Sequence, residues 1–284
     1  MRTAPSLVPL AVFVAAGCTG AAPFTDSGPP SAGPPGIDVT GRARDVLDVS
    51  GGSFEGLCAT LLDPTTRTVD GEMGAIDTVP LADDGEFRFE DLTARPELGM
   101  VLAIDDCDDN GGRTALPTVT GLPESRYAGL LDGDVVFARA WMMSPASLAA
   151  LEQGARELGQ EGVLTGGGFL VGFVTTADAR PQPVGGVTVA CRSCGPVAPW
   201  YLDDDAADGL FGGASGPNAE TDDGRGGFVV PAAPYGTWEA TDTGGTLEFG
   251  SVVTGGTAGK VVVTGFVVGD DDTGPYQPGP PSPP

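Results

Sequence analysis

Histidine is absent from the sequence, and lysine occurs once, as Lys260. Without histidine the chain cannot build a Ser-His-Asp triad, a Cys-His protease pair or a His-ligated zinc site. Its 14 Lys and Arg residues stand against 39 Asp and Glu residues, which gives a net charge of −25. No basic stretch is dense enough to follow a phosphate backbone, so the sequence predicts no nucleic-acid partner. The acidic excess is typical of a surface that keeps a protein soluble.

Glycine and proline are abundant, with 46 and 26 residues. This composition favours strands and turns over long helices. The length of 284 residues fits two modest domains.

The amino terminus has the pattern of a signal peptide over residues 1–17. Arg2 supplies a positive charge, and the apolar run from Leu7 to Ala16 is too short to span a bilayer as a helix. The following Ala15-Ala16-Gly17-Cys18 resembles a bacterial lipoprotein signal, although such signals usually carry Leu at the position of Ala15.

The lipoprotein resemblance implies cleavage before Cys18, a diacylglycerol thioether and palmitate on that cysteine, and membrane lipid as a partner. Thr19 stands where an Asp would signal inner-membrane retention, so we expect the outer membrane. The alternative is ordinary cleavage near Ala21-Ala22-Pro23, which would release a secreted soluble protein.

The remaining chain divides into folded and unfolded segments. We predict a disordered tether over residues 18–36 and a disordered Pro-rich tail over residues 269–284, because neither segment can bury enough apolar surface to fold. Between them we predict a first β-sandwich over residues 37–143, a helix and linker over 144–162, and a second β-sandwich over 163–268.

Short strand patterns bounded by Gly and Asp-Gly turns fill both halves. The first half has seven: Ile37–Val46, Gly56–Leu62, Ala75–Leu81, Glu86–Leu92, Met100–Asp105, Ala115–Gly121 and Asp134–Met142. The second half has seven more: Gly168–Thr175, Val184–Cys191, Trp200–Leu202, Gly227–Val230, Thr237–Thr241, Thr246–Val253 and Lys260–Val268. We therefore predict an all-β protein of two seven-stranded Ig-like sandwiches.

One short helix is predicted between the sandwiches. Ser144 has the character of an N-cap, Pro145 fits the first helical position, and apolar residues then recur every three to four positions. The helix is expected to end at Gly159 or Gly162, with its apolar stripe on a sheet.

A motif occurs once in each half. Asp84-Gly85-Glu86-Phe87 opens one strand and Asp223-Gly224-Arg225-Gly226-Gly227-Phe228 opens another, and the second copy is followed by Pro234-Tyr235-Gly236. The pattern resembles the carboxypeptidase regulatory-like module, a seven-stranded transthyretin-like sandwich, and the second copy matches better. The resemblance implies an accessory, non-catalytic module. We also expect Asp84-Gly85 to form a hairpin turn.

Four cysteines remain besides Cys18, an even number that suggests disulfides in an oxidising compartment. We predict a Cys58–Cys107 bridge in the first sandwich and a small loop closed by Cys191 and Cys194. A redox role for the second pair is the alternative, although no thioredoxin-like pattern surrounds it.

An acidic segment offers a metal-binding alternative. Asp106, Asp108 and Asn110 fall at positions 1, 3 and 5 of a calcium loop, with Gly111 at the turn. Position 12 would be Pro117 where such a loop has Glu, so a solvated acidic loop is the competing interpretation.

Aromatic residues could form a sugar-binding platform: Trp141, Trp200, Tyr201, Tyr235 and Trp238. The alternating strand around Trp238 predicts a core position for it, which leaves the adjacent pair Trp200 and Tyr201 as the surface candidate.

These observations predict a non-catalytic, lipid-anchored cell-envelope protein with a structural or binding role and no cofactor. The alternative is a calcium-assisted surface protein that binds a carbohydrate or other polymer, and the partner would be a glycan or a protein. A carboxylate hydrolase would instead require a concave pocket with two carboxyl groups about 5–9 Å apart.

Overall fold

A computed structural model describes residues 36–48, 53–68, 72–108, 115–131, 133–164, 168–178, 181–205, 209–212, 218–256 and 258–269. The strands of the first half are β1 (Ile37–Asp45), β2 (Leu57–Arg67), β3 (Met73–Pro80), β4 (Glu86–Leu92), β5 (Met100–Asp106), β6 (Thr118–Leu122) and β7 (Val135–Met142). A short 3-10 turn at Glu124–Arg126 lies between β6 and β7. Helix α1 (Pro145–Glu157) follows β7. The second half has β8 (Phe169–Thr175), β9 (Val187–Cys191), β10 (Trp200–Tyr201), β11 (Gly227–Pro231), β12 (Gly236–Asp242), β13 (Ser251–Thr254) and β14 (Val261–Val267).

Each half folds as a sandwich of three strands against four. In the first, the sheet β4-β1-β7 faces the strands β3-β2-β5-β6. In the second, the sheet β13-β12-β9 faces the strands β10-β11-β8-β14. Side chains that alternate along these strands fill two cores, one around Phe89 and Leu61 and one around Trp238 and Phe266. The predicted fold class of two seven-stranded sandwiches is confirmed.

The two sandwiches share a strand arrangement that matches the sequence motif. In each, the first strand pairs antiparallel with the strand of the Asp-Gly motif and parallel with the last strand, giving β4-β1-β7 and β11-β8-β14. In each, a glycine of the first strand lies opposite the motif phenylalanine, Gly41 opposite Phe87 and Gly172 opposite Phe228. A Cβ at Gly172 would lie 2.0 Å from the Phe228 ring, so the absence of a side chain lets the ring cover the strand.

The sandwiches are joined by a strand pairing that the sequence did not predict. β6 of the first sandwich and β14 of the second run parallel, with Val261 opposite Thr118 and Val263 opposite Thr120. The pairing merges two four-stranded sheets into one sheet of eight strands. A hydrogen-bonded ladder therefore crosses from one sandwich to the other.

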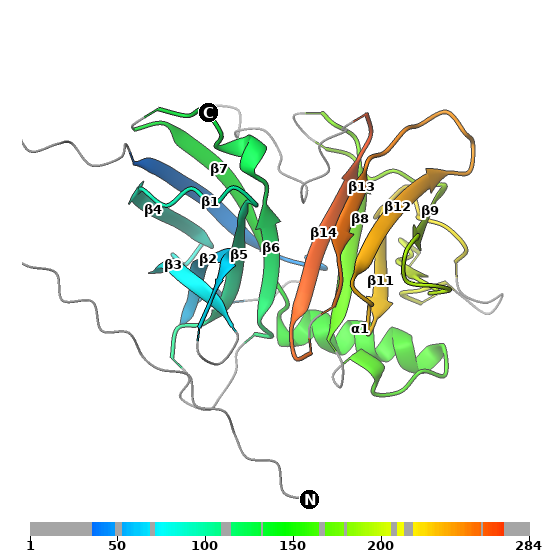
Figure 1. Ribbon diagram of the computed structural model, residues 1–284. Helices are drawn as coiled ribbons and strands as arrows, with labels where there is room; N and C mark the ends of the chain where they lie inside the picture. The colour runs from blue at the N-terminus through cyan, green and yellow to red at the C-terminus, as the bar shows by residue number, and fades with distance from the viewer. Residues whose placement is uncertain are drawn as a thin grey trace, which may run out of the picture. The chain divides into compact units, whose positions relative to one another are not determined.

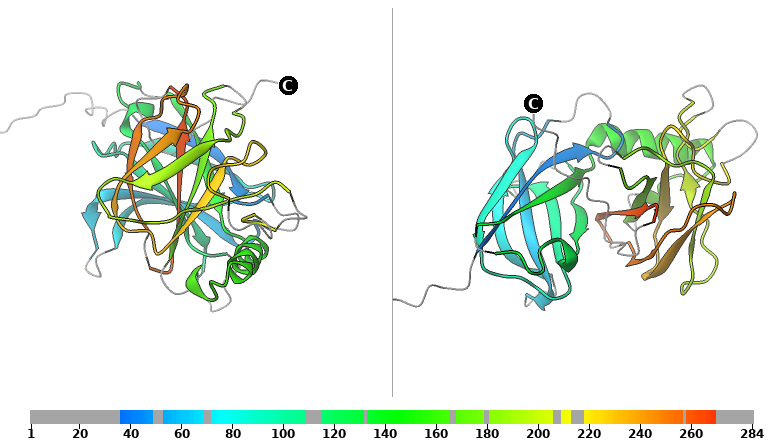
Figure 2. Two further views of the ribbon diagram at one scale, coloured as in Figure 1. Left: turned by 90° about the vertical axis from the view of Figure 1, so that its right-hand side faces the viewer. Right: turned by 90° about the horizontal axis from the view of Figure 1, so that it is seen from above.

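Helix α1 begins as predicted. The Ser144 hydroxyl accepts a hydrogen bond from the Ser147 amide, and Pro145 is the first helical residue. The buried side chains of Leu151 and Ala155 belong to one apolar cluster with Phe169 and other residues of the second sandwich. Figures 1 and 2 show the helix running alongside the strands of that sandwich. This cluster also takes in residues of the first half, so α1 covers a third core at the junction of the sandwiches.

A buried carboxylate fixes the start of α1 to the end of β1. Asp45 is only 8% exposed, and its two oxygens accept hydrogen bonds from the Ser144 hydroxyl at 2.5 Å and the Ser147 hydroxyl at 2.6 Å. The negative charge lies at the amino-terminal end of the helix, where the helix dipole favours it. The helix is thereby connected to the first sandwich as well as packed on the second.

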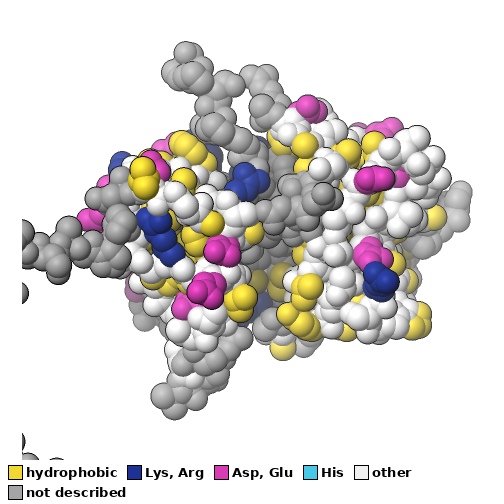
Figure 3. All heavy atoms as spheres, turned by 45° about the horizontal axis from the view of Figure 1, so that its top comes forward, with side chains coloured by type: hydrophobic (Ala, Val, Ile, Leu, Met, Phe, Trp, Pro, Cys, Tyr) yellow, Lys and Arg dark blue, Asp and Glu magenta, His cyan; other side chains and the backbone are white. Residues whose placement is uncertain are grey.

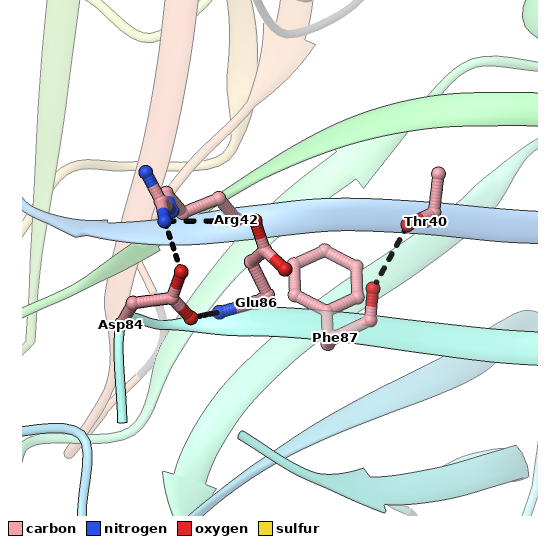
Figure 4. Close-up of polar contacts among 5 residues, drawn as sticks. All are labelled: Thr40, Arg42, Asp84, Glu86 and Phe87. Atoms are coloured by element: carbon pink, nitrogen blue, oxygen red, sulfur yellow. Dashed lines mark hydrogen bonds and ion pairs between the residues drawn. The ribbon is translucent and has the colours of Figure 1, made fainter. Parts of the chain in front are cut away.

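The Asp84-Gly85 turn is not the predicted hairpin. Its flanking strands lie in different sheets, since β3 pairs with β2 and β4 pairs with β1. Asp84 accepts a hydrogen bond from the Glu86 amide and forms an ion pair with Arg42, as Figure 4 shows. The Glu86 amide first, and then Arg42, lower the pKa of the Asp84 carboxyl. The chain does turn at Asp84-Gly85 as predicted, but this turn carries the chain from one sheet to the other.

Strand β13 is also shorter than the strand predicted for this part of the chain. A strand was predicted over Thr246–Val253, whereas β13 begins at Ser251. The carboxylate of Asp242 accepts hydrogen bonds from the amides of Gly244, Thr246 and Leu247, which holds this segment as a turn.

The Asp242 turn should make the protein sensitive to acid. The amides of Thr246, Leu247 and Gly244 lower the pKa of the Asp242 carboxyl to about 2. A carboxyl with a depressed folded-state pKa stabilises the fold above its unfolded pKa, about 3.9, and that contribution is lost as the pH falls through about 2. We expect a carboxyl-carbon NMR titration to give Asp242 a midpoint near pH 2, and Asp242→Asn to lose less stability between pH 4 and pH 2 than wild type. A midpoint near pH 4 would contradict this account.

Candidate functional site

The predicted bridge between Cys58 and Cys107 is present. Cys58 lies on β2 and Cys107 directly follows β5, and since these strands pair, their Cα atoms are 4.9 Å apart. A second disulfide joins Cys191 to Cys194, at the end of β9. There the Ser193 hydroxyl accepts a hydrogen bond from the Thr237 amide of β12, so the small loop is held against the neighbouring strand.

The acidic segment that suggested calcium is only partly described. Asp106 is the last residue of β5, and Asp108 is exposed just beyond the Cys58–Cys107 bridge. Asn110 lies outside the described residues, so calcium binding at Asp106, Asp108 and Asn110 stays a prediction. Among the residues that the structure does describe, no group of three or more acidic or cysteine side chains is arranged to hold a metal ion.

The proposed sugar platform of Trp200 and Tyr201 is wrong. The two residues are neighbours on β10, so their side chains point to opposite faces of the sheet. Tyr201 is buried, and its hydroxyl accepts a hydrogen bond from the Val189 amide at 2.7 Å. Trp200 packs edge-on against Phe211 instead. Trp238 is fully buried, as its alternating strand predicted, while Tyr235 is 79% exposed.

A cavity of about 180 Å³ lies where the two sandwiches meet. Five apolar side chains line it: Val46, Leu47, Trp141, Phe173 and Leu202. Trp141 of β7 and Phe173 of β8 stack across the junction with ring centroids 4.8 Å apart. The cavity therefore has an aromatic wall built from both halves of the chain.

Four charged residues also line the cavity: Arg44, Asp45, Asp48 and Arg225. Asp45 is the carboxylate that accepts hydrogen bonds from Ser144 and Ser147, and Arg44 and Asp48 are exposed. Trp141 was among the aromatic candidates and Arg225 belongs to the Asp-Gly motif, but the cavity itself could not be predicted because its lining comes from segments far apart in the chain.

Charge is dispersed on the face drawn in Figure 3. Figure 3 shows acidic side chains in small separate groups on one face of the molecule. Within the part of the chain that the structure describes, no helix is long and apolar enough to cross a bilayer. Cys18, the predicted lipid attachment site, lies outside the described residues.

Comparison with known proteins finds distant similarity to solved structures. No protein-family model and no curated protein matches the chain. Among solved structures, the TIE protein of Bacillus anthracis is 9% identical, with a TM-score of 0.23, over 82% of this chain and 34% of that chain. The shaft pilin SpaA from Lactobacillus rhamnosus GG is 10% identical, with a TM-score of 0.22, over 82% of this chain and 97% of that chain.

A third solved structure, the minor pilin GBS52 of Streptococcus agalactiae, is 11% identical, with a TM-score of 0.25, over 87% of this chain and 100% of that chain. The chain spans about a third of the TIE protein's length. Scores this low carry no argument about function or partners.

Proposed function

We propose that the chain is a non-catalytic protein of the bacterial cell envelope, anchored by lipid on Cys18 in the outer membrane, with a structural or binding role. The observation that carries the proposal is the continuity between the two sandwiches. The β6–β14 ladder and the shared core under α1 connect them at two places. Because the two sandwiches are connected at two places, they can bear a load as one unit. A structural element of the cell surface must do this.

The position of β1 supports this role. β1 is the first described strand after Cys18, and it runs parallel to β7 with eight paired positions from Asp38 to Asp45. A pull on a lipid-anchored amino terminus would act along β1. The hydrogen bonds of a parallel ladder are evenly spaced along the strands, so such a pull would be shared among several of them.

The chemistry of the cavity supports a non-catalytic assignment. Asp45 is its buried carboxylate, and both of its oxygens already accept hydrogen bonds from serine hydroxyls. Those serines belong to the start of α1, so the carboxylate stabilises the helix. An acid that serves as a helix anchor is poorly placed to act as one of a pair of hydrolytic carboxylates.

We further propose that both halves are carboxypeptidase regulatory-like modules. The repeated order of first strand, motif strand and last strand supports this, as does the Gly–Phe pairing in each half. The first half lacks the Pro-Tyr-Gly turn of the second, yet its motif phenylalanine Phe87 lies opposite a glycine of the first strand, as Phe228 does. Such modules are accessory domains, which fits a structural or binding role.

The anchor is tested by replacing Cys18 with Ser in the chain expressed with its own signal. Wild type should partition into membranes and carry the mass of a diacylglycerol, whereas Cys18→Ser should lose both because serine offers no thiol for the thioether. Thr19→Ser is the matched control and should behave as wild type. Should wild type prove soluble and unlipidated, the anchored-lipoprotein proposal fails and a freely secreted protein takes its place.

A further inference from the structure

The junction cavity has hydrogen-bond donors without acceptors. The Nε atom of Arg225 is buried and makes no hydrogen bond to any described residue. It forms a long ion pair with the Asp204 carboxylate at 4.0 Å, which is beyond hydrogen-bond distance. A buried polar atom without a partner is costly and is commonly satisfied by a bound molecule.

The second donor is Arg44, which follows the buried Ala43 on β1. Its side chain is exposed, and it forms no hydrogen bond or ion pair with the described part of the chain. The other arginines of the same strand and sheet differ in this respect, since Arg42 pairs with Asp84 and Arg88 pairs with Asp38. Two arginines at one cavity are thus available to a ligand.

The acids of the cavity do not use these donors. The two oxygens of Asp45 are taken by Ser144 and Ser147. Asp48 is exposed, so solvent and salt screen its charge. Neither Asp45 nor Asp48 accepts a hydrogen bond from Arg44 or Arg225 in the described structure, and a carboxylate is the acceptor that arginine binds best.

The remaining wall is apolar and of a size that suits one ring. Trp141 and Phe173 stack beside the cavity, and Leu202 is 1% exposed. The volume of about 180 Å³ is slightly larger than the roughly 150 Å³ of an engineered apolar cavity that holds benzene.

We propose that this cavity binds a small aromatic carboxylate, with the carboxylate on Arg225 and Arg44 and the ring between Leu202 and the Trp141–Phe173 pair. This inference goes beyond the proposed envelope role and does not depend on the lipid anchor. The carboxylate of the ligand would accept hydrogen bonds from Arg44 and from the Arg225 Nε, which has no other hydrogen-bond partner among the described residues. The ring of the ligand would pack on the apolar wall.

Equilibrium dialysis of the full chain against labelled benzoate tests the proposal. Benzoate should bind at one site with a dissociation constant on the order of millimolar, as expected for so small a ligand. Benzyl alcohol keeps the ring without the charge, and acetate keeps the charge without the ring. Both should bind about tenfold more weakly. Equal binding of benzoate and benzyl alcohol would overturn the role of the arginines.

Single substitutions test whether benzoate binds in the junction cavity. Arg225→Gln should weaken benzoate binding about tenfold and the exposed Arg44→Gln about threefold, because each removes a charged donor. Arg192→Gln is the control, since Arg192 pairs with Glu239 on the β9–β12 sheet and should leave binding unchanged. Equal affinity in wild type and Arg225→Gln, or no binding by wild type, would refute the proposal. If Arg225→Gln fails to fold, Arg44→Gln and the benzyl alcohol comparison decide.

Discussion

Replacing Cys58 and Cys107 together by Ala should lower the free energy of unfolding by about 4 kcal/mol. The bridge spans 49 positions of sequence, and closing a loop of that length removes much of the conformational entropy of the unfolded chain. A loss of about 4 kcal/mol is a large part of the 5 to 15 kcal/mol that holds a typical domain folded. Urea unfolding under oxidising conditions measures it.

The second disulfide provides a matched control for the first. Cys191 and Cys194 are three positions apart, so the same entropic argument predicts a loss of only about 2 kcal/mol for their double replacement by Ala. Both variants remove one disulfide, and they differ mainly in the length of the loop that the disulfide closes. Comparing them therefore tests whether loop-closure entropy causes the loss of stability. Equal losses would show that loop closure is not what the long bridge contributes.

Trp238→Ala should cost about 4 kcal/mol of unfolding free energy. Trp238 is fully buried in the core of the second sandwich, where it lies opposite Val252 on one side and Cys191 on the other. Its indole nitrogen donates a hydrogen bond to the Thr254 carbonyl at 3.1 Å. The variant would leave both a cavity and an unpaired carbonyl, and chemical denaturation measures the sum.

Tyr235→Ala is the control for Trp238→Ala. Tyr235 lies three residues earlier on the same segment but is 79% exposed, so its removal should change the unfolding free energy by less than about 0.5 kcal/mol. Similar losses in the two variants would mean that Trp238 is not part of the core.

Local patterns in the sequence were enough to predict most of the elements. Phe87 and Phe89 are buried and Arg88 between them is exposed, as strand alternation requires. The cap at Ser144 with Pro145 after it correctly predicted where α1 begins. These signals are local, because each depends on residues within one turn or one strand.

Features that depend on distant residues could not be predicted in the same way. The β6–β14 pairing joins Thr118 to Val261, and no residue type near either position encodes that choice. The junction cavity has the same property, since Arg44 and Arg225 belong to different sandwiches. The prediction of a sugar platform at Trp200 and Tyr201 was wrong for a different reason. Two adjacent residues on a strand point to opposite faces of the sheet, so they cannot form one aromatic surface.

The β6–β14 ladder also protects the chain against self-association. β14 reads Val-Val-Val-Thr-Gly-Phe-Val and carries no charge, and in the second sandwich alone it would be an edge strand with unpaired backbone groups. Exposed, uncharged, Val-rich edges are templates for aggregation. In the whole chain β14 lies between β8 and β6, paired along its length with β8 and over Val261–Val263 with β6. The first sandwich thus covers an edge of the second, and a cut between the halves would leave the free edge of β14 open to pairing with another chain.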